Sequence, residues 1–217
     1  MLIMRDVNSY HPAMTESMTR SRREEYADTT RAALLDAARE LFVAEGYGQV
    51  GVEAISRAAR VTRGAFYHHF ADKPGLFEAL VISLQAEALA KVSAVSAKTA
   101  DPAARLSAAS AAFLDICVEP PYRRLVIEDA PAVLGAARCR EIEDESVIGA
   151  LITALRARHE AGRFDAPDPR LAARMIARML CEAALQLPTA KDPTRMRRDA
   201  LEVVGRVLAT FDPESRK

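Results

Sequence analysis

Apolar side chains recur along most of this 217-residue chain at the spacing of a helix face. In the first strong run, about residues 30–45, Leu34, Ala38 and Phe42 share one face, and Gly46 supplies a C-terminal stop. Two short helical patterns then follow between Val50 and Phe70, and a longer one covers about residues 72–97. Alanine and leucine are abundant and β-branched runs are scarce, so the pattern predicts an all-α fold of about nine helices.

Asp-Pro pairs mark further helix starts in the second half of the chain. They begin at Asp101, Asp168 and Asp192, where aspartate acts as the N-cap and proline fits the first helical position. The helices expected from these marks and from the apolar stripes cover about residues 101–118, 122–129, 133–159, 169–187 and 193–211. We expect Pro120-Pro121 to end the helix that precedes 122–129, and Pro131 to end the helix 122–129 itself.

The last two predicted helices are apolar over more than half of their circumference. Such helices must be buried on two faces, and pairing with a second copy in a four-helix bundle is the simplest solution. The pattern therefore predicts a homodimer. The residues expected at its interface are Leu171, Ile176, Leu180, Leu187, Val204, Leu208 and Phe211. The alternative is an ordinary core within one monomer.

The stretch from Val50 to Pro74 carries the most specific signal. Its first short helix has Val52, Ile55 and Ala59 on one face, and after a tight turn Thr62 can cap a second. In that second helix Phe66 and Phe70 lie four residues apart and share a buried face. Its outward side chains are Arg63, Gly64, Tyr67 and His68. Because Gly64 and Ala65 allow close backbone approach and the others can contact phosphates and base edges, this face suits the DNA major groove.

Charge and cysteine content limit the kinds of site and the cell compartment that the sequence allows. The net charge is zero, so a nucleic-acid site must be a local patch; Arg57, Arg60, Arg63 and Lys73 stand against one acid in residues 57–73. Three distant cysteines form neither a disulfide framework nor a metal spacing, which indicates a reducing cytoplasm. No apolar run approaches a membrane span. Neighbouring histidines diverge too far to share an ion, so no metal or cofactor is expected, and an enzyme is the least favoured reading.

The run from Thr62 to Phe70, followed by Asp72-Lys73 and Leu76-Phe77, resembles the DNA-binding domain of the TetR (tetracycline-repressor-like) family. The resemblance covers about residues 29–80. It implies a helix-turn-helix domain over residues 29–75 and an effector-binding and dimerisation domain over residues 76–217. Residues 1–28 are polar and lack an apolar period, which predicts a disordered leader.

The resemblance also implies roles for residues of the second short helix, Thr62 to His69, which would read the DNA. Arg63 and Gly64 would face base edges, and the small Ala65 would let the helix backbone approach the DNA closely. Thr62, Tyr67, His68 and Lys73 would contact phosphate. Arg60 departs from the family pattern, which has glycine there; if the turn needs a positive φ, Arg60 bears strain, and its charge can compensate at a phosphate.

A cavity is expected between the interrupted helices and the long amphipathic ones. Its predicted lining is Phe113, Cys117, Tyr122, Val126, Ile152, Leu155, Met175, Met179, Arg178 and Glu182; the alternative is that these residues are core or interface. The function predicted is a homodimeric repressor on a near-palindromic double-stranded DNA operator, released by a small-molecule effector. A DNA-binding regulator without an effector, an activator or an architectural protein, is the alternative.

Overall fold

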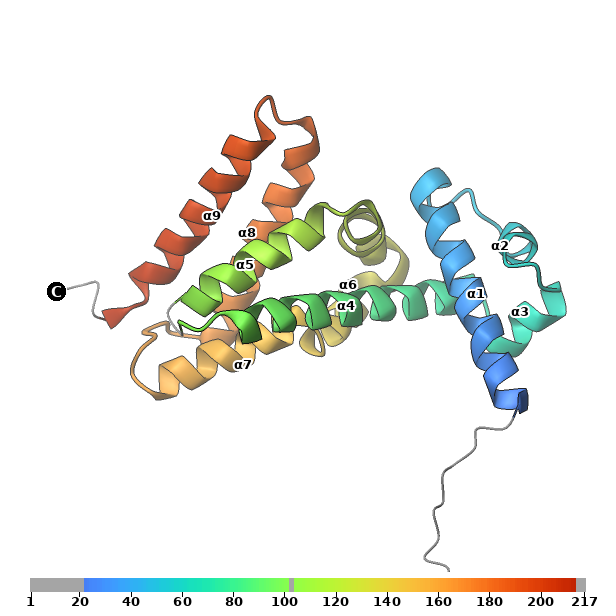
Figure 1. The fold of residues 1–217 in the computed structure, drawn as a ribbon, viewed down its shortest axis with the longest axis horizontal. Coiled ribbons are helices and arrows are strands. Elements are labelled where there is room, and N and C mark those ends of the chain that lie inside the picture. Colours follow the sequence, from blue (N-terminus) through green and yellow to red (C-terminus); the bar gives the residue numbers. More distant parts are fainter. Residues whose placement is uncertain (1–21, 102–103, 214–217) are drawn as a thin grey trace, which may run out of the picture.

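The structure is a computed structural model that describes residues 22–101 and 104–213 (Figure 1). The described residues form helices and turns without a strand, which confirms the all-α prediction. In chain order the elements are α1 (Arg22–Glu45), α2 (Val52–Ala58), α3 (Arg63–His69), α4 (Lys73–Lys98), α5 (Ala104–Val118), a π-helical segment η1 (Tyr122–Asp129), α6 (Ala130–Asp144), α7 (Val147–Glu160), α8 (Pro169–Gln186), a 3₁₀ turn η2 (Leu187–Thr189) and α9 (Pro193–Thr210).

Side-chain caps form at four helix starts that the sequence predicts. Thr62 Oγ1 accepts from the Ala65 N–H at 3.1 Å, and Asp72 Oδ1 accepts from the Gly75 N–H at 2.7 Å. Asp168 and Asp192 cap α8 and α9 in the same way, each with proline in the first turn. Each cap satisfies an N–H that the helix leaves unpaired, a contribution of about 1 kcal/mol. The sequence therefore located these starts correctly.

Three predictions about helix boundaries are wrong. Helix α1 begins at Arg22, so residues 22–28 are helical and do not belong to a disordered leader; residues 1–21 lie outside the described part of the chain. Pro131 does not break the chain, because it occupies the first turn of α6, where no backbone N–H is needed. The interruption falls instead at Gly135 (φ 80°), and Ser146 caps a separate helix α7, so the predicted helix 133–159 is two helices.

The long helix α4 joins two parts of the molecule. Figure 1 shows α1–α3 at one end of α4, and α5 and α7–α9 towards its other end. With 26 residues, α4 extends about 39 Å. It is long and apolar enough to be a candidate membrane span by length and composition, with a third of that window buried in the protein. Its contacts with α1, α5, α6 and α7 identify it as a core helix.

Helices α6 and α8 are held together by an ionic cluster. The carboxylate of Glu143, 6% exposed, accepts from Arg174 at 3.1 Å and from Arg178. The neighbouring Asp144 accepts from Arg170 at 2.6 Å and from Arg174. Because the three arginines recur every four residues on α8, one face of that helix carries the whole set. The cluster therefore links α6 to α8 through charged side chains.

Candidate nucleic-acid interface and ligand cavity

Helix α3 presents the face that the sequence predicted. Thr62, Arg63, Gly64, Tyr67 and His68 are exposed, and Ala65 is half-buried. Phe66 is fully buried and Phe70 is 6% exposed, so both belong to the core formed by α1–α3, hereafter the head. The division arises because the two phenylalanines lie one helical turn apart and anchor α3 against α1 and α2.

On this face the side chain of Arg63 is held by two other side chains of the same chain. Its Nη1 donates to Glu53 Oε1 of α2 at 2.7 Å, and its Nη2 donates to Tyr67 Oη at 3.4 Å. The guanidinium also lies 5.6 Å from the centre of the Tyr67 ring. The hydrogen bond to Tyr67 and the charge of Glu53 raise the pKa of Arg63. All three side chains are exposed, so these contacts orient Arg63 and exchange readily with others.

Gly64 has no internal reason to be glycine. An added Cβ would meet only Thr62 Oγ1, at an ordinary 3.7 Å, and its φ is not in the left-handed region. The missing side chain therefore opens the outer surface of α3. At the end of α3, His69 is half-buried, and burial together with the charges of His68 and Arg31 lowers the pKa of His69.

The turn between α2 and α3 has the geometry anticipated for Arg60. Its φ is +57°, and it is the non-glycine residue with positive φ in the described ranges 22–101 and 104–213. The Val61 N–H donates to Ser56 O at 2.9 Å and the Arg60 N–H donates to Arg57 O at 3.1 Å, which is a Schellman motif. Arginine in this left-handed position costs about 1–2 kcal/mol. Its side chain is exposed and makes no ion pair or hydrogen bond within the described part of the chain.

Lys73 is placed differently from the prediction. Its Nζ donates to Tyr47 O and to Val50 O, both at 3.0 Å, and lies 4.1 Å from the centre of the Tyr47 ring. The side chain is half-buried, and two of its three N–H donors face inward. Lys73 therefore fastens the α1–α2 connection to the start of α4. A phosphate contact would have to use its third N–H donor.

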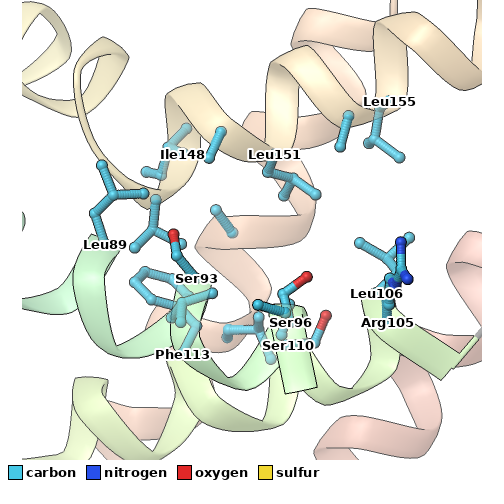
Figure 2. A pocket seen from close by; sticks show the side chains of 18 of the residues that line it. Leu89, Ser93, Ser96, Arg105, Leu106, Ser110, Phe113, Ile148, Leu151 and Leu155 are labelled. Atoms are coloured by element: carbon cyan, nitrogen blue, oxygen red, sulfur yellow. The ribbon is translucent and has the colours of Figure 1, made fainter. Parts of the chain in front are cut away.

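A cavity of about 560 Å³ lies in the second part of the molecule (Figure 2). Its walls come from the C-terminal half of α4 (Leu89 to Ala97), the first half of α5 (Arg105 to Phe113), and α7 (Val147 to Arg158). Ala177 and Leu180 of α8 complete it. The volume falls within the range of small-molecule sites in proteins.

Two of the ten predicted lining residues, Phe113 and Leu155, line this cavity. The other eight lie elsewhere: Cys117, Tyr122, Val126, Ile152, Met175, Met179, Arg178 and Glu182. Tyr122 donates to the buried Gln85 Oε1 at 2.9 Å, Arg178 pairs with Glu143, and Glu182 accepts from Gln186 at 2.6 Å. Sequence reasoning missed the cavity's Ser93, Ser96, Arg105 and Arg158, although Ser93 and Ser96 interrupt the apolar stripe of α4.

Cys117 and Cys181 are buried against each other between α5 and α8. Burial raises the pKa of the Cys117 thiol, and hydrogen bonding from Cys117 with the nearby Arg178 charge lowers the pKa of Cys181. Cys139 of α6 is half-buried, and burial raises its pKa. The cysteines therefore serve the packing between helices rather than the cavity.

The predicted dimer surface is divided by the structure. Ile176, Leu180, Leu187 and Val204 are 1–6% exposed within one chain, so they belong to its core and offer no face to a second copy. Leu208 and Phe211 are half-buried. Leu171 is 56% exposed, and Met175, Leu185 and Val203 share its exposure at 60%, 38% and 51%. These four make up the exposed apolar surface of α8 and α9.

A capped helix with a basic, glycine-containing outer face, set by a tight turn against a preceding helix, defines a helix-turn-helix DNA-binding regulator. Residues 34–80 match the sequence model described as "Bacterial regulatory proteins, tetR family". Residues 103–211 match that described as "Tetracyclin repressor-like, C-terminal domain". The chain belongs to the TetR family of transcriptional regulators, which are not enzymes.

Individual relatives agree with this assignment. The HTH-type transcriptional regulator UidR of Escherichia coli K12 is 37% identical over 65 residues, 30% of this chain and about a third (33%) of UidR. The crystal structure of a TetR-family regulator from Pectobacterium atrosepticum aligns with a TM-score of 0.68 and 29% identity, covering 89% of this chain and 98% of the other. RolR in complex with the ligand resorcinol aligns with a TM-score of 0.65 and 21% identity, covering 88% and 93%, and shows the shared fold.

Proposed function

We propose that this regulator is a cytoplasmic, homodimeric repressor that a small-molecule effector releases from a near-palindromic operator. The observation that carries the proposal is the shared use of α4. Its C-terminal half forms a wall of the 560 Å³ cavity, and its N-terminal end carries the helix-turn-helix head through Lys73 and Phe77. A ligand in the cavity therefore touches the helix that positions the head.

The head is tied to α4 by contacts that would transmit a movement. The rings of Phe42, Tyr47 and Phe77 pack with centres 4.9–5.7 Å apart, joining α1 to α4. Arg39 of α1 donates to Glu87 of α4 at 3.3 Å. Arg124 of η1 lies against Gly46, where an added Cβ would come within 2.8 Å of its Nη2. These contacts make α1 to α4 one packed unit, so a shift of α4 would move α3 with it.

DNA recognition is assigned to the exposed face of α3. We propose that Arg63 leaves Glu53 to read a base edge, that Gly64 and Ala65 allow close approach, and that Thr62, Tyr67 and His68 contact the backbone. The exposed Arg57 and Arg60, which have no partner in the described ranges, would supply phosphate contacts. Two copies would occupy successive major grooves about 34–36 Å apart.

The dimer is assigned to the exposed apolar surface of α8 and α9, defined above by Leu171, Met175, Leu185 and Val203. Its three members on α8 recur at intervals of four and ten residues, which places them along one side of the helix. Met175→Glu should convert a dimer to a monomer in sedimentation velocity. Val95→Glu, which changes a 38% exposed residue of α4, is the matched control. Dimers that persist in the Met175 variant would refute this interface.

Selection of bound sequences from random DNA tests recognition. The selected sites should be near-palindromes, and Arg63→Ala should relax the preference at one position in each half-site, by about 1–3 kcal/mol for the favoured base. Arg57→Ala should instead weaken binding to all sequences and reduce the salt slope by about one unit. Equal effects of the two variants on base preference would refute the assignment.

A regulator without an effector remains the second candidate. Its C-terminal domain would not need an accessible apolar cavity, whereas this one has a cavity walled by the helix that carries the head. Operator affinity that no cavity ligand changes, in anisotropy titrations with ligand bound at saturation, would favour this second candidate.

A further inference from the structure

The cavity is chemically asymmetric along its length. Figure 2 shows Leu89, Phe113 and Ile148 towards one end and Arg105 with Leu106 at the other. The hydroxyl groups of Ser93, Ser96 and Ser110 lie between them. Its surface is mostly apolar, and no carboxylate lines it among residues 22–101 and 104–213. The charged side chains on its wall are therefore two arginines.

Both arginines belong to the same end of the cavity. Along α7, Ile148 lies at the apolar end and Leu155 at the opposite end (Figure 2). Arg158, which also lines the cavity, follows Leu155 by about one turn of the helix. Arg158, Leu106 and Ser110 also line an adjoining hollow of about 180 Å³, which places Arg158 near the start of α5. Asp212 lines that hollow but not the cavity.

The guanidinium groups retain donors for a ligand. Arg105 Nε donates to Thr99 O at 3.0 Å, which leaves its terminal N–H groups uncommitted to that carbonyl. Arg158 is half-buried, and its guanidinium makes no hydrogen bond or ion pair within the described part of the chain. A half-buried guanidinium without a counter-ion favours an anion, and paired guanidinium N–H groups match a carboxylate well.

We propose that the effector is an amphiphilic anion: an apolar body that fills the Leu89–Phe113 end and a single carboxylate held by Arg158 and Arg105. This inference rests on the proposed effector site and specifies the chemistry of its ligand. Neutral molecules of the same shape would leave the arginines unpaired, and cationic ones would be repelled by them.

Isothermal titration calorimetry with three probes tests the charge requirement. Decanoate should bind the full chain more tightly than decan-1-ol, and decyltrimethylammonium should bind least. Arg158→Gln should weaken decanoate about 10- to 100-fold, the worth of a hydrogen bond to a charged group, and leave decan-1-ol unchanged. Arg156→Gln, an exposed arginine on the same helix outside the cavity, should change neither. Decan-1-ol binding as tightly as decanoate, or no decanoate binding at all, would overturn the inference.

A cavity-filling variant locates the bound probe. Ala154 lines the cavity but is exposed, so Ala154→Trp adds bulk to the wall without replacing a core side chain. It should abolish decanoate binding, and unchanged binding would place the anion elsewhere and refute the site. Operator affinity is measured separately by anisotropy. Decanoate that binds through Arg158 without altering operator affinity would support the ligand class while refuting effector-controlled release.

Discussion

Replacing Lys73 with methionine tests whether this side chain holds the head together or contacts DNA. Methionine keeps most of the aliphatic stem and removes the ammonium. Two hydrogen bonds to Tyr47 O and Val50 O and the contact with the Tyr47 ring are lost. A lysine in the first turn of α4 also opposes the helix dipole, so its presence there is explained by these inward contacts.

The expected loss follows from these contacts. A hydrogen bond to a charged group contributes about 1.5–3 kcal/mol, and a cation–π contact about 0.5–1 kcal/mol. Lys73 is half-buried, so water replaces part of each interaction, and methionine recovers some packing. The lower ends of these ranges give about 3.5 kcal/mol in total, and these two effects reduce it, so we expect a loss of about 2–3 kcal/mol in the free energy of unfolding.

Urea denaturation followed by circular dichroism measures this loss, and hydrogen exchange of residues 50–70 shows whether it is confined to the head. Lys91→Met is the matched control, because Lys91 also lies on α4 and its ion pair with Glu119 is exposed. Its loss should cost less than about 1 kcal/mol. The reasoning is refuted if Lys73→Met costs under about 1 kcal/mol while the salt slope of DNA binding falls by about one unit.

Three further outcomes are expected. Arg60→Gly should stabilise the protein by about 0.5–1 kcal/mol in denaturant titrations, because relief of left-handed strain exceeds the added chain entropy; a loss of stability would contradict the strain argument. Glu143→Ala should cost about 3 kcal/mol by leaving Arg178 without its acceptor and Arg174 with Asp144 alone, whereas Glu202→Ala, at an exposed pair with Arg206, should cost under about 1 kcal/mol; equal losses would remove the special role of the cluster. In native protein a thiol reagent should modify the half-buried Cys139 first and reach Cys117 and Cys181 only on unfolding, as mass spectrometry after timed quenching can show.

The reading head could be predicted from sequence because its signals are local. Thr62 and Asp72 act within three residues, and the spacing of Phe66 and Phe70 alone determines the buried face of α3. The positive φ of Arg60 agrees with the conditional expectation drawn from the resemblance, because the family pattern has glycine at this position. The inward contacts of Lys73 could not be predicted, because its partners, Tyr47 and Val50, lie more than twenty positions away and no periodicity links them.

The C-terminal part was predicted less well because periodicity does not say which neighbour covers a helix face. The apolar residues of α8 include Ile176 and Leu180, which pack inside one chain, and Leu171 and Met175, which remain exposed. The same uncertainty placed Arg178 in a cavity, although Glu143, thirty-five residues away, holds it at the α6–α8 contact. Proline was also over-read at Pro131, since its effect depends on whether it falls in the first turn or the interior of a helix.

The length of α4 determines how small a ligand's effect on it need be. If α4 pivots at its cavity end, a tilt of about 5° carries the end about 39 Å away through about 3 Å. In a two-fold dimer the opposite displacements of the two heads add, so their separation would change by about 6–7 Å against a groove repeat of about 34–36 Å. Angular leverage of this kind lets a side-chain-sized adjustment around the cavity misalign both heads without repacking either one.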